Sequence, residues 1–253
     1  MIPGFQEESF RGQPFLRYTL PGLGELFSAS LFLKGPFMDG AGGDPSLSRA
    51  SLLPLFPGAE CHTAPIQVHG TTLIQAGAPG TNLPLRPEGD GILIEKTGTE
   101  GSLRFADCFP VVLFSHVPSP WLAILHSGFK GTVDNIAGLA CRKIFSMAGR
   151  SPRRTWAWIG PGIGGDFYCR PRSEAWTEKG LESFSPAFVK QKETSACFFL
   201  GDQIRLQLLE EGIGEENIFS FPFCTFRDNR ICYSYRRGDM ANRLFLLAFL
   251  KSA

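Results

Sequence analysis

The sequence places two side chains capable of binding a metal or attacking a substrate at the ends of neighbouring apolar segments. Cys108 follows LRFAD, and His126 ends WLAILH, 18 residues further on. A link of that length accommodates one strand, a hairpin-like connection and the next strand, so both side chains can reach the same edge of a sheet. A third candidate, His69, lies upstream in QVHG.

A thiolate and two imidazoles form a donor set that suits zinc, and three protein ligands leave a fourth position open for chemistry. The same residues also allow a nucleophilic dyad of Cys108 and His126, or a buried thiol beside an unrelated histidine. Asp107 precedes the thiol, but it would point away from a site that Cys108 faces, because neighbouring residues on a strand alternate. Spacing alone leaves all three interpretations open.

The loop HSGFKG, residues 126–131, follows directly and leads into a predicted helix. Gly128 and Gly131 allow a sharp turn, and Lys130 adds a positive charge next to the free N–H groups of a first helical turn. This pattern fits the binding of a phosphate or a carboxylate. An ordinary helix entry with a solvated lysine would use the same residues.

The pair Arg236–Arg237, after YSY, is a second candidate for anion binding. We expect a strand over 231–235, and neighbouring arginines there would point to opposite faces, so at most one would enter a pocket. Surface charge at a sheet edge is the alternative interpretation.

Continuous apolar runs predict the strands that position these residues, at 103–106, 111–114 and 121–126. Because these runs do not alternate, both faces of their sheet should be covered. The following helix is expected to begin with Thr132 as its N-cap and to end at Gly149. Strands and helices mix without a strict βαβ rhythm, which favours an α+β fold with mixed sheets.

Three other segments are expected to be irregular. Residues 34–46 and 170–196 have the composition of loops, and the glycine turn GPGIGG at 160–165 predicts backbone that passes close to something, such as a ligand. The turn does not match a dinucleotide fingerprint, because no helical pattern follows it.

Composition limits the class of protein. Of the 253 residues, 43% are hydrophobic and 19% charged, and the net charge of +1 comes without a basic block, which argues against nucleic acid or an anionic membrane as partner. The first residues contain acids and no apolar core of a signal peptide, so we expect a cytoplasmic protein. The seven cysteines have no framework spacing, and we expect about five of them to be free thiols.

Several motifs together resemble a known family. ADCFPVVLF followed by WLAILHSGFKGTVDNIAG is similar to the ADC-P-hydrophobic … H-A-G-W-(R/K)-G-T motif of the laccase-domain (polyphenol-oxidase-type, YfiH-like) proteins. The similarity extends to QVHG, DGILIEK, WIGPGIGGDFY and EEGIGEENIFSFPFCT … YSYRRGD, over roughly residues 64–250. It implies one domain over 1–253 with a four-layer α/β/β/α fold, in which 1–60 matches the family poorly.

The resemblance also implies a function, that of a zinc-dependent purine nucleoside phosphorylase. Such proteins split adenosine, inosine, guanosine and methylthioadenosine with phosphate, and they deaminate adenosine. Zinc would be held by His69, Cys108 and His126, with copper as an alternative in vitro. Cys108, His126 and Asp107 would be catalytic, and the substrate would be bound by Gly128, Lys130, Gly131 and Arg236. Cys224 and Thr225 are expected near the site.

Two departures from the family pattern stand out. The early R-x-G-G-V-S motif has no counterpart, since LFSASLFLKGPF at 26–37 lacks the arginine, and HAGW is HSGF here through Ser127 and Phe129. Two other functions fit the residues: a cysteine hydrolase built on Cys108 and His126, either deamidase-like or editing cell-wall precursors, and a non-catalytic family member. The expected partners are a purine nucleoside and phosphate, with no nucleic acid and no membrane, in a monomer or weak homodimer.

Overall fold

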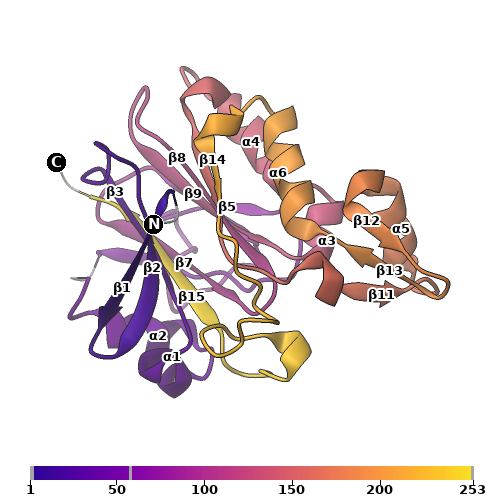
Figure 1. Cartoon of the computed structure of the whole chain (residues 1–253). Coiled ribbons are helices and arrows are strands. Elements are labelled where there is room, and N and C mark those ends of the chain that lie inside the picture. The colour runs from indigo at the N-terminus through magenta and orange to yellow at the C-terminus, as the bar shows by residue number, and fades with distance from the viewer. Residues whose placement is uncertain (1–2, 57–58, 252–253) are drawn as a thin grey trace.

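Two six-stranded sheets packed face to face form the centre of the computed structural model, which describes residues 3–56 and 59–251 (Figure 1). The first sheet has the order β1 (Phe5–Phe10), β2 (Gln13–Tyr18), β3 (Phe27–Phe32), β15 (Leu244–Leu250), β7 (Thr99–Phe105) and β4 (Cys61–Thr63). The second has the order β14 (Ile218–Ser220), β10 (Trp156–Ile159), β8 (Phe109–Ser115), β9 (Trp121–Ser127), β6 (Gly91–Ile94) and β5 (Leu73–Gln75).

Helices cover the outer faces of both sheets. Against the first sheet lie α1 (Pro36–Ala41) and α2 (Pro45–Leu52), and against the second lie α3 (Phe129–Val133), α4 (Ile136–Phe145) and α6 (Leu200–Glu210), as Figure 1 shows. A small sheet of β11 (Cys169–Pro171), β13 (Ser195–Phe198) and β12 (Val189–Gln191) projects beside α5 (Ala175–Ser183). The predicted α+β fold of four layers, α/β/β/α, with mixed sheets is confirmed.

Aromatic side chains fill the space between the two sheets. Phe27 of β3 stacks on Phe114 of β8 with ring centroids 4.2 Å apart, and Trp158 of β10 lies 5.6 Å from Phe27. Behind the second sheet, a separate apolar cluster joins it to the helices, including Ile144 of α4 and Ile204 of α6. Both faces of β8 and β9 are therefore buried, as their continuous apolar sequences predict.

The strands around Cys108 are arranged differently from a simple meander. β7 belongs to the first sheet and β8 to the second, so the three residues between them cross from one sheet to the other. β8 and β9 then form an antiparallel hairpin in which Pro110 lies opposite His126. This register places Cys108 and His126 at the same edge of the second sheet, as the spacing predicts.

The prediction of one helix that begins with Thr132 as its N-cap and ends at Gly149 is wrong in detail. α3 ends at Val133 and α4 begins at Ile136, because Asn135 adopts a left-handed conformation with φ of 58° and caps α4 by accepting the Gly138 N–H at 2.8 Å. Asparagine tolerates this region of backbone space better than most residues. Thr132 therefore lies inside α3 and is not an N-cap.

Three further expectations are corrected. The segment 34–46 contains α1, and 170–196 contains α5 and the three strands of the small sheet. No strand forms over 231–235; a 3₁₀ turn at Tyr235–Arg237 occupies the region instead. Five cysteines are free, as expected, and the other two, Cys169 and Cys197, face each other across β11 and β13 in a disulfide that their spacing did not indicate. Within the described residues, no helix combines the length and apolarity needed to cross a bilayer.

A buried polar cluster lies between the outer face of the first sheet and α2. Arg49 of α2 pairs with Glu100 of β7, and His62 of β4 shares a 2.7 Å hydrogen bond between its Nε2 and the Ser102 hydroxyl. Burial, together with the positive charge of Arg49, lowers the pKa of His62 to about 4. His62 is therefore neutral in the folded protein throughout the mildly acidic range.

We predict that His62 makes the protein less stable in mild acid. Between pH 6.5 and about 4 the unfolded chain holds a proton on His62 that the folded chain does not, so stability falls as the pH is lowered through this range. The loss should approach about 3 kcal/mol near pH 4 and should vanish roughly one pH unit above 6.5, where His62 is neutral in both states. Urea unfolding at pH 7.5 and pH ~4.5 should show a smaller loss for His62→Gln than for the wild type. Equal losses would contradict this account.

Candidate metal centre

Three donor atoms, one each from His69, Cys108 and His126, converge at the end of the second sheet. They all lie within 4.8 Å of one another. Cys108 comes from the connection between the sheets and His126 from the last residues of β9, whereas His69 comes from the loop between β4 and β5. The three residues singled out by their chemistry are thus brought together, and the cluster could bind a metal.

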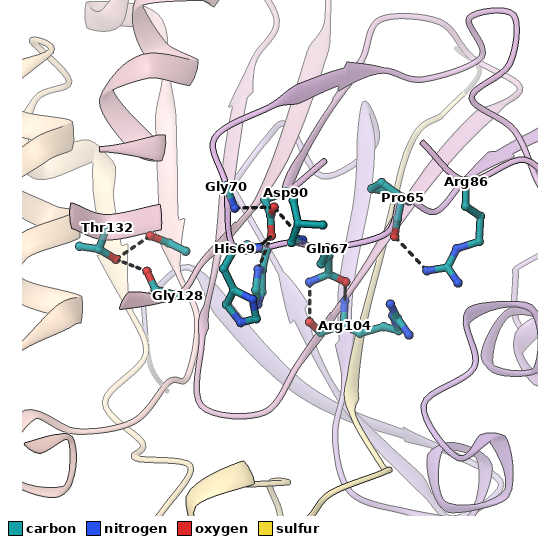
Figure 2. A network of polar contacts seen from close by, with 12 residues as sticks. Pro65, Gln67, His69, Gly70, Arg86, Asp90, Arg104, Gly128 and Thr132 are labelled. Atoms are coloured by element: carbon teal, nitrogen blue, oxygen red, sulfur yellow. Dashed lines mark hydrogen bonds and ion pairs between the residues drawn. The ribbon is translucent and has the colours of Figure 1, made fainter. Parts of the chain in front are cut away.

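Asp90, directly before β6, fixes two of these three residues. Its carboxylate lies 2.8 Å from His126 Nδ1 and accepts the backbone N–H groups of Val68, His69 and Gly70 at 3.1, 3.0 and 2.8 Å (Figure 2). The hydrogen bond to Nδ1 leaves Nε2 of His126 for the cluster. Burial alone would raise the pKa of Asp90, but His126 and the backbone N–H groups hold it below its usual value.

The loop that carries His69 is bent to reach the cluster. His69 has φ of 60°, a left-handed conformation that is unusual for a residue with a side chain and that its hydrogen bonds to Asp90 hold in place. Asp90 was not among the residues predicted from the sequence. The available signal was an acid between two glycines, in EGDG, immediately before the buried strand GILI.

Gly128 closes the cluster from the other side. A Cβ at this position would lie 2.8 Å from Cys108 Sγ and 2.9 Å from His69 Cδ2. Its backbone is extended, with φ of −86°, so close approach rather than an unusual conformation requires glycine here. Gly128 acts by leaving room for the donor atoms.

The charges of the cluster favour a thiolate. Burial raises the pKa of the Cys108 thiol, but the imidazoles of His126 and His69 outweigh it and lower the value to about 6. Burial lowers the pKa of His126, whereas the thiolate and Asp90 raise it to about 9. A thiolate and two imidazoles are the donor chemistry that borderline-soft metals such as zinc prefer, so these residues fit such an ion.

Asp107 lies in the connection between β7 and β8, where strand alternation does not apply, and its carboxylate is hydrogen-bonded to residues other than the three candidate ligands. Its φ is 83°, and its two carboxylate oxygens accept the Thr225 hydroxyl at 2.7 Å and the Arg236 N–H at 2.8 Å. The acid in contact with a candidate ligand is therefore Asp90. Asp107 instead holds the C-terminal segments that contain Thr225 and Arg236 against the connection between β7 and β8. Cys224 lies further away and accepts the Gly164 N–H at its sulfur.

The glycine turn at 160–165 passes close to protein side chains and also lines a second cavity, and the approach of a ligand to it stays a prediction. Added Cβ atoms at Gly162 and Gly165 would lie 2.4 Å from the rings of Phe109 and Phe199. Only glycine permits this approach, so the turn serves packing. Ile163 alone from this turn reaches the pocket described next.

The cluster lies in a pocket of about 600 Å³ with cationic and aromatic walls. Of the predicted substrate-binding residues, Lys130 and Arg236 line it; Gly131 is buried behind it, and Arg237 instead covers the Phe226 ring. The short α3 sums few peptide dipoles, so side chains supply most of the positive charge here. The cationic lining residues are Arg104, Lys130, Arg170, Arg236 and Arg243.

Two aromatic rings, those of Phe129 and Tyr168, contribute to the lining of the pocket. Phe129 and Tyr168 have ring centroids 5.6 Å apart, and the guanidinium of Arg170 lies 4.6 Å from the Phe129 centroid. Arg236 covers the ring of Tyr168 at 4.8 Å. Flat aromatic and guanidinium surfaces suit a planar ligand, and the sequence alone did not indicate Tyr168 or Arg170.

Comparison with known proteins identifies the family. The family model described as multi-copper polyphenol oxidoreductase laccase matches residues 50–250. The chain belongs to the YfiH-like laccase-domain family. Among curated relatives, a purine nucleoside phosphorylase of Xylella fastidiosa is 26% identical over 73% of this chain and 70% of its own. Purine nucleoside phosphorylase YfiH of Shigella flexneri is 30% identical over 72% of each.

Solved structures share the fold of this laccase-domain protein. YlmD from Geobacillus stearothermophilus superposes with a TM-score of 0.82 at 24% identity and covers 98% of this chain and 99% of its own. A protein from Bacillus licheniformis titled hypothetical protein YfiH gives 0.80 at 18% identity, with 98% and 100% covered. The N-terminal strands, where the sequence resembles the family least, are thus part of the shared fold.

We predict that Asp90→Asn weakens metal binding. An amide offers one acceptor oxygen, so its NH₂ group must face at least one of the N–H groups that Asp90 now accepts, which loosens both histidines. Loss of such a supporting carboxylate typically costs roughly ten- to a hundredfold in metal affinity. Metal competition titrations should show this loss. A variant with unchanged affinity would contradict the assigned role.

We also predict that Gly128→Ala displaces the donor atoms. The added methyl overlaps Cys108 and His69, and such overpacking typically costs about 1–3 kcal/mol. Elemental analysis of purified protein should show less bound metal than in the wild type. Gly40→Ala is the matched control, because nothing lies within 4 Å of its Cβ position, and it should leave the metal content unchanged.

Proposed function

We propose that this protein is a metal-dependent purine nucleoside phosphorylase whose zinc is held by His69, Cys108 and His126. The observation that carries the proposal is the convergence of these donors in one pocket that also holds cationic and flat aromatic side chains. The curated relatives named purine nucleoside phosphorylase support the reaction class. Zinc in that position would supply Lewis-acid polarisation of a substrate oxygen.

The residues of the chain would bind the two substrates in distinct ways. The partly exposed Tyr168, together with the guanidiniums of Arg170 and Arg236 that lie over the Phe129 and Tyr168 rings, would provide the flat surface on which a purine base can stack. Lys130 and Arg236 would position phosphate against the ribose C1′, where a nearby anion stabilises the positive charge that develops as the glycosidic bond breaks. Phosphorolysis of inosine, adenosine, guanosine or methylthioadenosine, and deamination of adenosine, fall within this proposal.

A cysteine hydrolase is the second candidate, and a specific observation favours it. Asp90, His126 and Cys108 are connected in a line, with a thiol pKa lowered by the imidazoles, which is the arrangement of a nucleophilic thiol with an oriented base. His69 distinguishes the two candidates, since a hydrolase has no need for a second imidazole within reach of the thiol. We therefore favour the metal-dependent phosphorylase.

The test is a phosphate-dependent assay on purified protein of known metal content. Inosine with phosphate should give hypoxanthine and ribose 1-phosphate, and Cys108→Ala should lose both the metal and at least roughly a hundredfold in rate. Cys61→Ala, a free cysteine outside the pocket, should keep both.

Removal of the metal separates the candidates. Under our proposal, chelation abolishes turnover and added zinc restores it. Full activity of the metal-free protein, lost at the rate at which Cys108 is alkylated, would reject the phosphorylase and support the hydrolase. Tight metal binding without turnover of any nucleoside would indicate a non-catalytic family member.

A further inference from the structure

Two arginines lie together on one face of the first sheet, at the end next to the pocket. Phe245 of β15 is the cross-strand partner of Arg104 on β7, and Arg243 lies two residues before Phe245. Arg104 and Arg243 therefore occupy diagonal positions on the same face of an antiparallel pair, close enough for long side chains to interact. Both line the pocket that contains the donor cluster.

The guanidiniums of Arg104 and Arg243 are held by backbone carbonyls. Within the described part of the chain, no carboxylate forms an ion pair with Arg104 or Arg243. Arg104 donates from Nη1 to the Gly43 carbonyl at 2.9 Å, and Arg243 donates only to backbone carbonyls. Carbonyl contacts orient a guanidinium without cancelling its charge, so two like charges face the same pocket.

A third arginine makes the charge imbalance larger. Arg86 is held by the carbonyls of Ala64 and Pro65, again without a carboxylate among the described residues; Figure 2 shows the contact with Pro65. Burial and the positive charges of Arg86 and Arg243 lower the pKa of Arg104, and Asp44 offsets them only in part. Asp44 is already engaged, since its side chain caps α2 by accepting two backbone N–H groups.

Gln67 fixes the position of Arg104 in the pocket wall. Its side-chain amide accepts the Arg104 N–H at 2.9 Å and donates to the Arg104 carbonyl at 2.8 Å, as a neighbouring strand would. Figure 2 shows Arg104 on one side of His69 and Gly128 with Thr132 on the other. Lys130 lies on α3, against the second sheet, whereas Arg104 belongs to β7 and Arg243 directly precedes β15, both strands of the first sheet, so the arginine pair and Lys130 come from different walls of the pocket.

We propose that Arg104 and Arg243 form a subsite for a phosphate group, distinct from the Lys130 wall of the same pocket. A phosphate carries two negative charges and oxygen acceptors for several donors, which matches two guanidiniums that lack a carboxylate partner. The phosphate is either the inorganic co-substrate, which would then bind here in place of Lys130 and Arg236, or an ester group of a nucleotide substrate. The inference rests on the proposed function for the choice of phosphate as the anion.

Binding without turnover tests the subsite. Purified protein is titrated calorimetrically with inorganic phosphate alone and, separately, with a nucleoside 5′-monophosphate alone. Arg104→Gln and Arg243→Gln should each weaken the binding of one of these ligands by roughly tenfold or more, because each removes a charged hydrogen bond. Arg172→Gln is the control, since Arg172 is exposed outside the pocket and contacts Gln191.

The outcomes discriminate between the sources of the phosphate. Weaker binding of inorganic phosphate supports the subsite as a co-substrate site, and weaker binding of the monophosphate alone supports it as a site for a substrate ester. Unchanged binding of both ligands by both variants, with thermal unfolding showing that they are folded, overturns the proposal. Because no turnover is measured, a protein that binds phosphate here but does not cleave nucleosides would reject the phosphorylase and leave the subsite standing.

Discussion

The site depends on one buried carboxylate. Asp90 is fully buried, and it is stable there only because it accepts three backbone N–H groups and the His126 imidazole. The same bonds hold the His69 loop in a left-handed conformation beside the end of β9. The hydrogen bonds that the Asp90 carboxylate needs thus hold the His69 loop beside the end of β9, and this brings the His69 and His126 donor atoms close to each other.

The two sheets provide a rigid frame for this constraint. Cys108 lies where the chain crosses from the first sheet to the second, so it is fixed between two packed layers. The aromatic core beneath, with Phe27 stacked on Phe114, holds the separation of those layers. The pocket walls come from both sheets and from the small sheet, which explains how cations from remote parts of the sequence surround one cluster.

Local sequence patterns predicted the features that depend on local chemistry. The apolar runs fixed the strands from 103 to 126, and the β8–β9 register then followed from hairpin geometry, so the meeting of Cys108 and His126 was predictable. The break at Asn135 was not, because one left-handed residue interrupts a continuous helical pattern. The proximity of Arg104 and Arg243 was not predictable either, because it arises only from the pairing of β7 with β15.

The contacts of Asp90 could not be predicted from the local sequence either. Its sequence signal was a single acid between glycines, and nothing local shows that three N–H groups and an imidazole will surround it. Asp107 is more prominent because it is next to Cys108, yet its partners, Thr225 and Arg236, are over a hundred positions away. Proximity in sequence therefore drew attention to Asp107, whereas the acid in contact with His126 is Asp90.

The contacts of Asp107 have a consequence for how the chain acquires its final form. They join residues 118 and 129 positions apart, and β15 lies in the first sheet between β3 and β7, which come from much earlier in the sequence. Closing such long loops lowers the conformational entropy of the chain before the contacts that stabilise the closed form can be made. The pocket and the first sheet are both completed only when the last tenth of the polypeptide docks, so a nascent or C-terminally shortened chain would lack the strand that joins β3 to β7 as well as the pocket residues Arg236 and Arg243.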